Sequence, residues 1–206
     1  KIKNIEIIDL TCPRVLLIHD LAKKLCKEGY FIILIAQKDH PEAIGTLGFC
    51  GKDYLAIDDI SKVADAIDII KSCGKNKVLI ISQTTFAEDK FKEISKAFNC
   101  RLKGYNVEII NTICPSTHTR QNETKVIASS VDMMIIIGDT NSSNSYKLYE
   151  IAKANCDNSY LIQDLDDLLN NNIDYSSVLK VGVMAGASTP IDLINEVVNY
   201  LKKENI

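Results

Sequence analysis

A tandem repeat constrains the fold of this chain more than any other feature of its sequence. The segments 7–13 and 109–115 are both apolar, strand-like runs that end in a Cys-Pro pair. Self-similarity at a period of about 100 residues predicts two copies of one domain rather than one continuous core. The stretch Cys100–Gly104 has the composition of a connector, so the expected domains are residues 1–104 and 105–206.

Each copy also carries polar loops at matching distances from its cysteine. One loop follows the cysteine at the same spacing in both copies, and a second follows at nearly the same spacing. The matched positions are Cys12, His40 and Thr84 in the first copy and Cys114, Ser142 and Ser188 in the second. Each copy therefore offers one thiol and two polar loops.

Short apolar runs alternate with helix-like patterns along the whole chain. Ile32–Ile35 and Met133–Ile137 are apolar without alternation, as parallel strands covered on both faces are. The two copies are expected to open with strands over 4–9 and 106–111. Strand–helix alternation predicts two tandem α/β domains, each a parallel sheet with helices on both faces. Ligands of such sheets bind at the carboxyl ends of the strands, where the cysteines and polar loops are expected.

Composition excludes some classes of partner and leaves others open. A net charge of −3 gives no reason to expect nucleic acid or an anionic membrane as a partner. No apolar stretch reaches the ~18 residues of a membrane span. Seven cysteines, an odd number without a secretory leader, favour reduced thiols and leave metal or redox chemistry open.

Two of the polar loops lead directly into expected helices. Hydroxyls and backbone N–H groups at the starts of helices bind phosphate, which favours Asn141–Ser145 and Ala185–Pro190 as anion sites. Taken alone, each loop is better explained as an ordinary helix N-cap. Their equivalent places in the repeat favour a shared, uncharged cradle for a small phosphorylated ligand.

The remaining polar groups suggest proton transfer and metal binding. His40 and Glu42 place an imidazole and a carboxylate two residues apart, able to bind an anion and move a proton, although a solvated helix start explains them equally well. Cys12 and Cys114 together could bind a soft metal. Two thiolates do not complete a zinc site or an iron–sulfur cluster, and Cys50 is not expected to complete one.

Taken together, the motifs resemble those of the 4-hydroxy-3-methylbut-2-enyl diphosphate reductase family, also called IspH or LytB. The motifs that carry this resemblance run in the family order over nearly the whole chain: Asp9–Pro13, Asp39–Glu42, Gly45–Gly48, Gln83–Thr85, Asn111–Cys114, Thr117, Arg120–Gln121, Asn141–Ser145 and Gly182–Pro190. The resemblance implies a trefoil of three α/β domains around a [4Fe-4S] cluster, with one cysteine from each domain. Cys12 and Cys114 match the second and third ligands, so the chain is expected to be two thirds of the trefoil and to lack the amino-terminal domain with its Gly-Phe-Cys motif.

The resemblance also implies a reaction, the last step of the non-mevalonate (MEP) isoprenoid pathway. In this step (E)-4-hydroxy-3-methylbut-2-enyl diphosphate loses its hydroxyl by two-electron reduction and yields isopentenyl and dimethylallyl diphosphate. Glu42 would deliver a proton and Thr84 would order the substrate hydroxyl. The residues expected to hold the substrate are His40, Thr84, Ser142, Ser143, Asn144 and Ser188.

The same resemblance implies partners and a location. A ferredoxin or flavodoxin would supply electrons to a monomeric enzyme in the bacterial cytoplasm or in the plastid (apicoplast) of a parasite. The chain on its own is expected to be a poor catalyst, because two cysteines hold a cluster weakly. Two alternatives stay open, a non-catalytic two-domain phosphate-ligand-binding protein with structural cysteines and a phosphosugar-type enzyme that uses His40 and Glu42 as acid and base.

Overall fold

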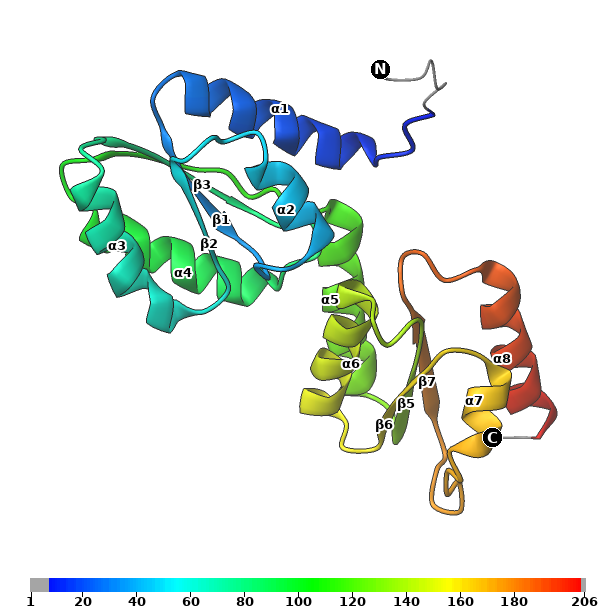
Figure 1. Ribbon diagram of the computed structural model, residues 1–206. Helices are drawn as coiled ribbons and strands as arrows, with labels where there is room; N and C mark the ends of the chain where they lie inside the picture. The colour runs from blue at the N-terminus through cyan, green and yellow to red at the C-terminus, as the bar shows by residue number, and fades with distance from the viewer. Residues whose placement is uncertain (1–7, 205–206) are drawn as a thin grey trace. The chain divides into compact units, whose positions relative to one another are not determined.

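The computed structural model describes residues 8–204 and divides the chain into two compact units, unit 1 (Lys1–Ile113) and unit 2 (Cys114–Ile206). Each unit contains one parallel sheet with helices packed against it (Figure 1). The expected class of two tandem parallel-sheet α/β domains is therefore confirmed. The strand expected over 4–9 lies largely outside the described residues.

Unit 1 has a four-stranded parallel sheet in the order β2-β1-β3-β4. Its elements are α1 (Pro13–Lys27), β1 (Phe31–Ile35), α2 (Pro41–Leu47), β2 (Tyr54–Ile57), the 3-10 turn η1 (Ile60–Lys62), α3 (Val63–Ser72), β3 (Lys77–Ser82), α4 (Glu88–Arg101) and β4 (Asn106–Ile109). All five residues of β1 are buried, as the unbroken apolar run predicts.

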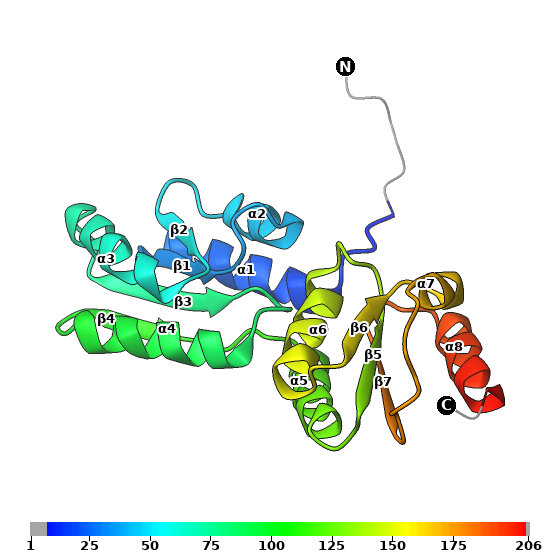
Figure 2. The same ribbon diagram turned by 90° about the horizontal axis from the view of Figure 1, so that it is seen from below.

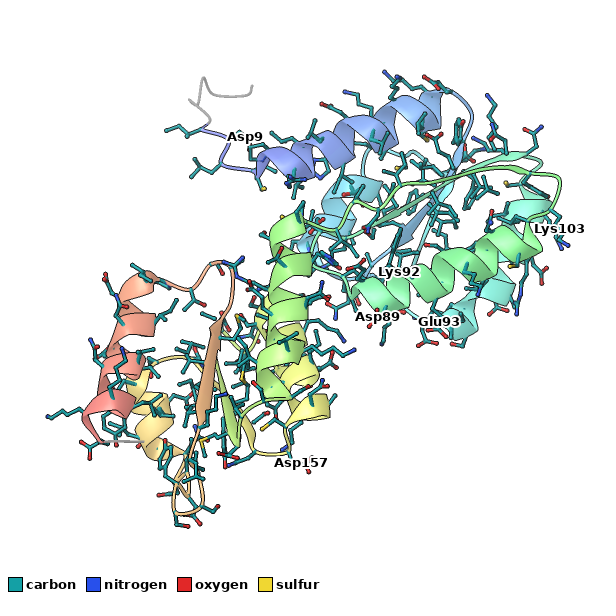
Figure 3. All side chains as sticks on the ribbon, turned by 180° about the vertical axis from the view of Figure 1, so that it is seen from behind. Asp9, Asp89, Lys92, Glu93, Lys103 and Asp157 are labelled. Atoms are coloured by element: carbon teal, nitrogen blue, oxygen red, sulfur yellow. The ribbon has the colours of Figure 1, made fainter. Side chains whose placement is uncertain are left out.

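The two faces of this sheet are covered by different helices. Ile33 and Ile35 of β1 pack in one apolar cluster with α3 and α4, whereas Ile32 and Leu34 pack in another with α1 and α2. Alternate side chains of a strand point to opposite faces, so one apolar strand supplies both clusters. α4 turns its charged residues away from the sheet, and Asp89, Lys92 and Glu93 are exposed (Figure 3).

Unit 2 repeats this plan with a three-stranded parallel sheet in the order β6-β5-β7 (Figure 2). Its elements are α5 (Pro115–Ala128), β5 (Met133–Ile137), α6 (Ser143–Asn155), β6 (Ser159–Ile162), α7 (Leu165–Asn170), β7 (Val181–Ala185) and α8 (Ile191–Lys203). α5 and α6 share an apolar cluster with one face of the sheet, and α7 and α8 share one with the other. No helix within residues 8–204 has the length and apolar character needed to cross a membrane.

The two sheets correspond strand by strand. Ile35 of β1 pairs with Ser82 of β3, and Ile137 of β5 pairs with Ala185 of β7. The backbone N–H of the residue after each of these partners bonds back to the same isoleucine, Gln83 to Ile35 at 3.0 Å and Gly186 to Ile137 at 2.9 Å. β3 and β7 are thus counterparts, and so are β1 and β5.

The division between the units falls later than the boundary expected after Gly104. β4, expected to open the second copy, belongs instead to the sheet of unit 1, where it pairs with β3. Ile110 continues this pairing, because its N–H donates to the carbonyl of Ile80 at 2.9 Å. Strand pairing, which is non-local, decides to which unit this segment belongs. α5 begins at Pro115, because proline suits the first turn of a helix.

Each sheet has a point at which consecutive connections leave in opposite directions. The chain leaves β1 for α2 on one face and leaves β3 for α4 on the other. In unit 2 it leaves β5 for α6 on one face and β7 for α8 on the other. The carboxyl ends of two such neighbouring strands form the crevice in which doubly wound folds bind ligands. His40, Thr84, Ser142 and Ser188 all follow these strand ends.

Candidate functional site

The strongest contact at the crevice of unit 1 joins Glu42 to Thr84. The N–H of Thr84 donates to Oε1 of Glu42, and its hydroxyl donates to Oε2, each at 2.7 Å. Glu42 lies in the first turn of α2 and Thr84 follows β3, so the two are far apart in sequence and meet only because β1 and β3 are neighbours. Thr84 is buried, and its two hydrogen bonds fix the orientation of the carboxylate.

His40 is the N-cap residue of α2. Its Nδ1 accepts a hydrogen bond from the N–H of Glu42 at 3.2 Å, so in the neutral ring Nε2 carries the proton. The ring is half-buried, and in this tautomer Nε2–H can donate to a ligand. The expectation that His40 starts a helix and the expectation that it can bind an anion are therefore compatible.

Gln83 is a site residue to which the sequence assigned no role. It is 2% exposed, accepts from the N–H of Gln37 at 3.3 Å and donates to the hydroxyl of Thr85 at 2.8 Å. The side chain thereby links the loop after β1 to the loop after β3. The available signal was its position, since a polar residue directly after a buried strand must find partners at the edge of the sheet.

The two cysteines occupy the same local position, the N-cap of a long helix. Cys12 precedes α1 and is exposed, and Cys114 precedes α5 and is half-exposed, with its Sγ 3.0 Å from the hydroxyl of Ser116. Asp9 precedes Cys12 in the chain. Its pKa is lowered by two hydrogen bonds from Thr11, of which the side-chain bond has the larger effect and the backbone bond the smaller.

The donor chemistry of these thiols suits iron and sulfide, but each unit contributes one thiol. Within residues 8–204 no group of three or more His, Cys, Asp or Glu side chains is arranged to hold a metal ion. An iron–sulfur cluster normally takes four protein ligands, or three when one iron stays open. The two thiols suit such a cluster in their chemistry, and each lies at the start of a helix.

In unit 2 the start of α6 is built to receive a polar ligand. Ser142 is the N-cap, and its hydroxyl accepts from the N–H of Ser145 at 3.4 Å. The side chain of Asn144 is 6% exposed, and neither its amide oxygen nor its amide nitrogen has a hydrogen-bond partner among the described residues. Buried polar groups without partners are rare, and such a group at a helix start indicates a ligand that would satisfy it.

Two glycines bring the ends of β5 and β7 against this helix. A Cβ added to Gly138 or to Gly186 would lie 2.3 Å from the hydroxyl oxygen of Ser145, which is buried. Thr189 anchors the same loop, since its hydroxyl donates to the carbonyl of Ile137 at 3.0 Å. The loop that carries the exposed Ser188 is therefore held close to the first turn of α6.

The structure thus forms two groups of expected site residues. In unit 1 it joins His40, Glu42 and Thr84 by hydrogen bonds. In unit 2 it gathers the start of α6, with Ser142, Ser143 and Asn144, beside the loop of Ser188. The first group offers an imidazole, a hydroxyl and a carboxylate, and the second offers hydroxyls and an amide.

Comparison with known proteins gives a consistent result. The family described as LytB protein matches residues 1–202. The 4-hydroxy-3-methylbut-2-enyl diphosphate reductase of Aquifex aeolicus is 37% identical over 204 residues, which cover 98% of this chain and 67% of that protein. The reductase of the same name from Clostridium tetani is 39% identical over 211 residues, which make up 31% of its length.

Solved structures agree with these relatives. The structure of (E)-4-hydroxy-3-methyl-but-2-enyl diphosphate reductase, the terminal enzyme of the non-mevalonate pathway, aligns with a TM-score of 0.60 at 37% identity over 98% of this chain and 69% of its own. The reductase from Plasmodium falciparum aligns with a TM-score of 0.82 at 28% identity, covering 95% of this chain and 59% of its own. The chain spans two thirds or less of most of these proteins.

Proposed function

The chain belongs to the LytB protein family, and we propose that it is the part of an iron–sulfur reductase that binds a diphosphate and delivers a proton. The substrate would be (E)-4-hydroxy-3-methylbut-2-enyl diphosphate, and the products isopentenyl and dimethylallyl diphosphate. The contact between Glu42 and Thr84 carries this proposal, because it fixes a carboxylate for proton transfer in the first turn of the helix that His40 caps.

The proton would reach the substrate through Thr84. When Glu42 is protonated, its O–H can donate to the hydroxyl oxygen of Thr84, whose own hydrogen then turns toward the oxygen that leaves the substrate as water. When Glu42 is ionised, the Thr84 hydroxyl points back to it at 2.7 Å, as in the structure. One hydroxyl thereby orders the substrate and relays the proton.

The side chains that would bind phosphate oxygens are neutral. His40 offers Nε2–H, Ser142 and Ser143 offer hydroxyls at a helix start, and Ser188 offers a third hydroxyl. Asn144 supplies an amide whose donors have no other partner among residues 8–204. Donors at helix starts stabilise phosphate oxygens without a cationic side chain.

Cys12 and Cys114 would be two of the ligands of a [4Fe-4S] cluster. When bound, such a cluster would pass on the two electrons of the reduction one at a time, with the external carrier reducing it again after each, and would supply an iron that can act as a Lewis acid. A small reduced electron carrier such as a ferredoxin or flavodoxin would refill it. The dehydroxylation is balanced because two electrons and two protons convert the substrate to product and water.

The proposal is tested on protein produced from the intact gene, reconstituted without oxygen with iron and sulfide. Cys12→Ser and Cys114→Ser should each lose the electron paramagnetic resonance signal of the cluster and the reductase activity, whereas Cys100→Ser, an exposed cysteine on α4, should keep both. A stable cluster with full activity in either of the first two variants contradicts the assignment. Diphosphate binding without any cluster would support a non-catalytic binding protein instead.

A further inference from the structure

Cys26 and Cys50 are two cysteines of unit 1 that meet although they lie in different helix–loop segments. Cys26 belongs to the last turn of α1, and Cys50 follows the end of α2. The thiol of Cys26 donates to the backbone carbonyl of Cys50 at 2.8 Å. Cys50 is part of the apolar cluster between these helices and the sheet, and Cys26 packs against it. The function proposed above uses neither thiol.

The two sulfur atoms are close to each other. After burial, the thiol of Cys26 is the second cause that raises the pKa of Cys50 from 9.0 to about 12. A carbonyl oxygen lies about 2.4 Å from the Cα of its own residue, so the hydrogen bond places the sulfur of Cys26 within about 5 Å of Cα of Cys50. Disulfides join cysteines whose Cβ atoms are about 3.5–4.5 Å apart, a separation that this contact allows.

The backbone on both sides of the contact is fixed. The N–H of Gly29 donates to the carbonyl of Cys26 at 3.1 Å, and the N–H of Cys50 donates to the carbonyl of Leu47 at 2.9 Å. Joining the two sulfur atoms therefore requires rotation of side chains and leaves both helices in place.

Unit 2 indicates that packing at this place does not require sulfur. The positions that correspond to the pair, counted from the cysteine before the first helix of unit 2, are Ala128 and Ala152. Both alanines are buried in one apolar cluster. The same two places of the repeat thus hold methyl groups in one unit and neighbouring thiols in the other.

We propose that Cys26 and Cys50 are a modification site, at which a peroxide oxidises the two thiols to a reversible disulfide. Cys26 is partly exposed whereas Cys50 is 1% exposed, so the peroxide reaches Cys26 first. Disulfides of this kind in proteins without a disulfide framework are typically transient and respond to the redox state. A small dithiol would reduce the bond again by thiol–disulfide exchange.

The oxidation takes place in two steps. The sulfur of Cys26 takes one oxygen as the O–O bond of the peroxide breaks, which gives a sulfenic acid and one water when the oxidant is hydrogen peroxide. The sulfur of Cys50 then attacks that of Cys26, the S–O bond breaks, the S–S bond forms, and a second water leaves with the Cys50 proton. The two thiols lose two electrons, and the peroxide gains them.

The disulfide would stabilise unit 1 and leave its crevice free. Cys26 and Cys50 lie at the C-terminal ends of α1 and α2, whereas Cys12 and His40 cap the N-terminal ends. A bond between residues that are 24 apart in sequence restricts the unfolded chain more than the folded one. This inference does not rest on the reductase function, because it involves none of the residues assigned to that function.

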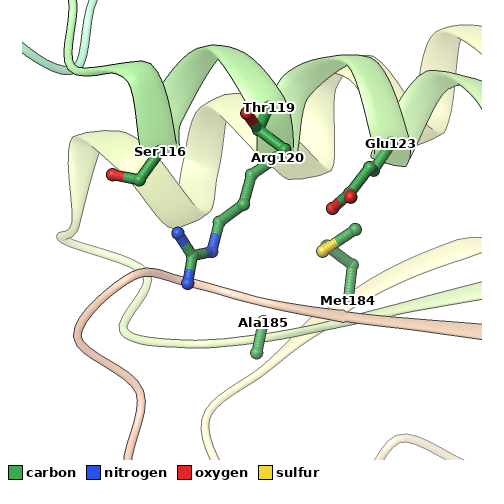
Figure 4. Close-up of a pocket in the computed structure, with 6 residues that line it drawn as sticks. All are labelled: Ser116, Thr119, Arg120, Glu123, Met184 and Ala185. Atoms are coloured by element: carbon green, nitrogen blue, oxygen red, sulfur yellow. The ribbon is translucent and has the colours of Figure 1, made fainter.

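α5, the counterpart of α1, has the same difference between its two ends. Residues between Ser116 and Glu123 line a hollow of about 460 Å³ against β7, and Figure 4 shows Arg120 reaching from α5 toward that strand. The last residue of α5, Ala128, is buried in the apolar cluster. In both units the first helix is accessible near its start and packed at its end, so a bond formed at the end stays clear of the crevice.

The test treats the 206-residue chain with hydrogen peroxide, blocks the remaining thiols with iodoacetamide and digests the protein with trypsin. Cys26 and Cys50 fall in separate tryptic peptides, residues 25–27 and 39–52, so mass spectrometry detects the disulfide as these two peptides joined with the loss of two hydrogens. We expect this link to be at least tenfold more abundant than a link of Cys26 to any other cysteine. Dithiothreitol should abolish it.

Variants distinguish the pair from unspecific oxidation. Cys26→Ser should abolish the link and leaves the buried Cys50 in place. Cys73→Ser is the matched control and should retain the link, because Cys73 is also partly buried at a helix end but donates to the carbonyl of Ile70 in its own helix at 2.9 Å. Oxidation should raise the melting temperature of the parent by about 5 °C or more and should not raise that of Cys26→Ser.

Three results would overturn the proposal. One is a Cys50 that stays reduced in every peroxide-treated sample and is alkylated once the protein is unfolded. Another is a Cys26 that links mainly to a different cysteine. The third is a link that forms as readily in the urea-unfolded chain as in the folded one, because the contact between the two thiols would then contribute nothing to it.

Discussion

Thr84 donates both its backbone N–H and its hydroxyl to the carboxylate of Glu42, each at 2.7 Å. The two residues follow neighbouring parallel strands. Glu42 lies in the first turn of α2, and Thr84 lies in the turn after β3. A carboxylate with both oxygens occupied in this way has one orientation. The chemistry assigned to Glu42 therefore depends on Thr84.

Thr84→Val keeps the shape of the side chain and removes only the hydroxyl. We expect turnover to fall about 100-fold or more, as for the loss of a positioned proton donor, because Oε2 of Glu42 loses its partner and the relay is interrupted. Thr84→Ser retains the hydroxyl and should restore most of the activity. Steady-state kinetics of the reconstituted enzyme would show the loss in kcat; full activity of the valine variant would remove Thr84 from the mechanism.

Asn144→Leu should change stability and binding in opposite directions. The buried amide of Asn144 has no hydrogen-bond partner among residues 8–204, so its removal ends an uncompensated desolvation penalty, and the free energy of unfolding should rise by about 1 kcal/mol. Affinity for inorganic diphosphate should fall at the same time. Urea unfolding and calorimetric titration measure the two effects, with Asn155→Ala at the exposed end of α6 as the control. A variant that loses both stability and binding would mean that the amide is part of the core.

Gly186→Ala and Gly138→Ala should each destabilise unit 2 by about 1–3 kcal/mol, because the new methyl group would overlap the hydroxyl oxygen of Ser145. The two differ in how they can be rescued. Ser145→Ala removes that oxygen and should restore most stability to Gly186→Ala, whose added Cβ would lie 3.5 Å from Cβ of Ser145. It should not rescue Gly138→Ala, where that distance is 2.9 Å. Double-mutant cycles of thermal unfolding distinguish the two cases, and equal rescue would contradict this packing.

The protonated thiol of Cys50 should contribute to the free energy of unfolding, and this contribution should be lost at alkaline pH. The pKa of the Cys50 thiol is raised from 9.0 to about 12, chiefly by burial and secondly by the neighbouring thiol of Cys26. An unfolded chain deprotonates this thiol near 9 and the folded chain does so only near 12, so the stability it contributes is complete below pH 9 and declines as the pH rises toward 12.

Replacing that thiol isolates the effect from other groups that titrate in alkali. The difference in free energy of unfolding between the parent and Cys50→Ala should therefore shrink between pH 8 and a pH above 10. Alkylation with iodoacetamide at pH 8 provides a second readout, in which the exposed Cys12 and Cys100 react quickly and the buried Cys50 does not. A pH-independent difference would show that the thiol titrates normally in the fold.

Local patterns predicted most of the elements because they depend on neighbouring residues. The run Ile32–Ile35 became a fully buried strand, and Pro41 starts a helix. Gln83 had no assigned role, because its partners Gln37 and Thr85 become relevant only when two loops meet. The boundary after Gly104 followed from composition, whereas β4 is placed by its hydrogen bonds to β3.

The sequence by itself determined the repeat, the α/β class, the residues that follow each strand end and the resemblance that names the reaction. These depend on periodicity, on turn-forming residues and on motifs, all of which are local. Only the tertiary structure decided that Glu42 meets Thr84, that the amide of Asn144 is buried without a hydrogen-bond partner among residues 8–204, and that β7 pairs with β5 alone in the same part of the chain. Such relationships arise when strands distant in sequence become neighbours, and strand order and register are properties of the whole sheet.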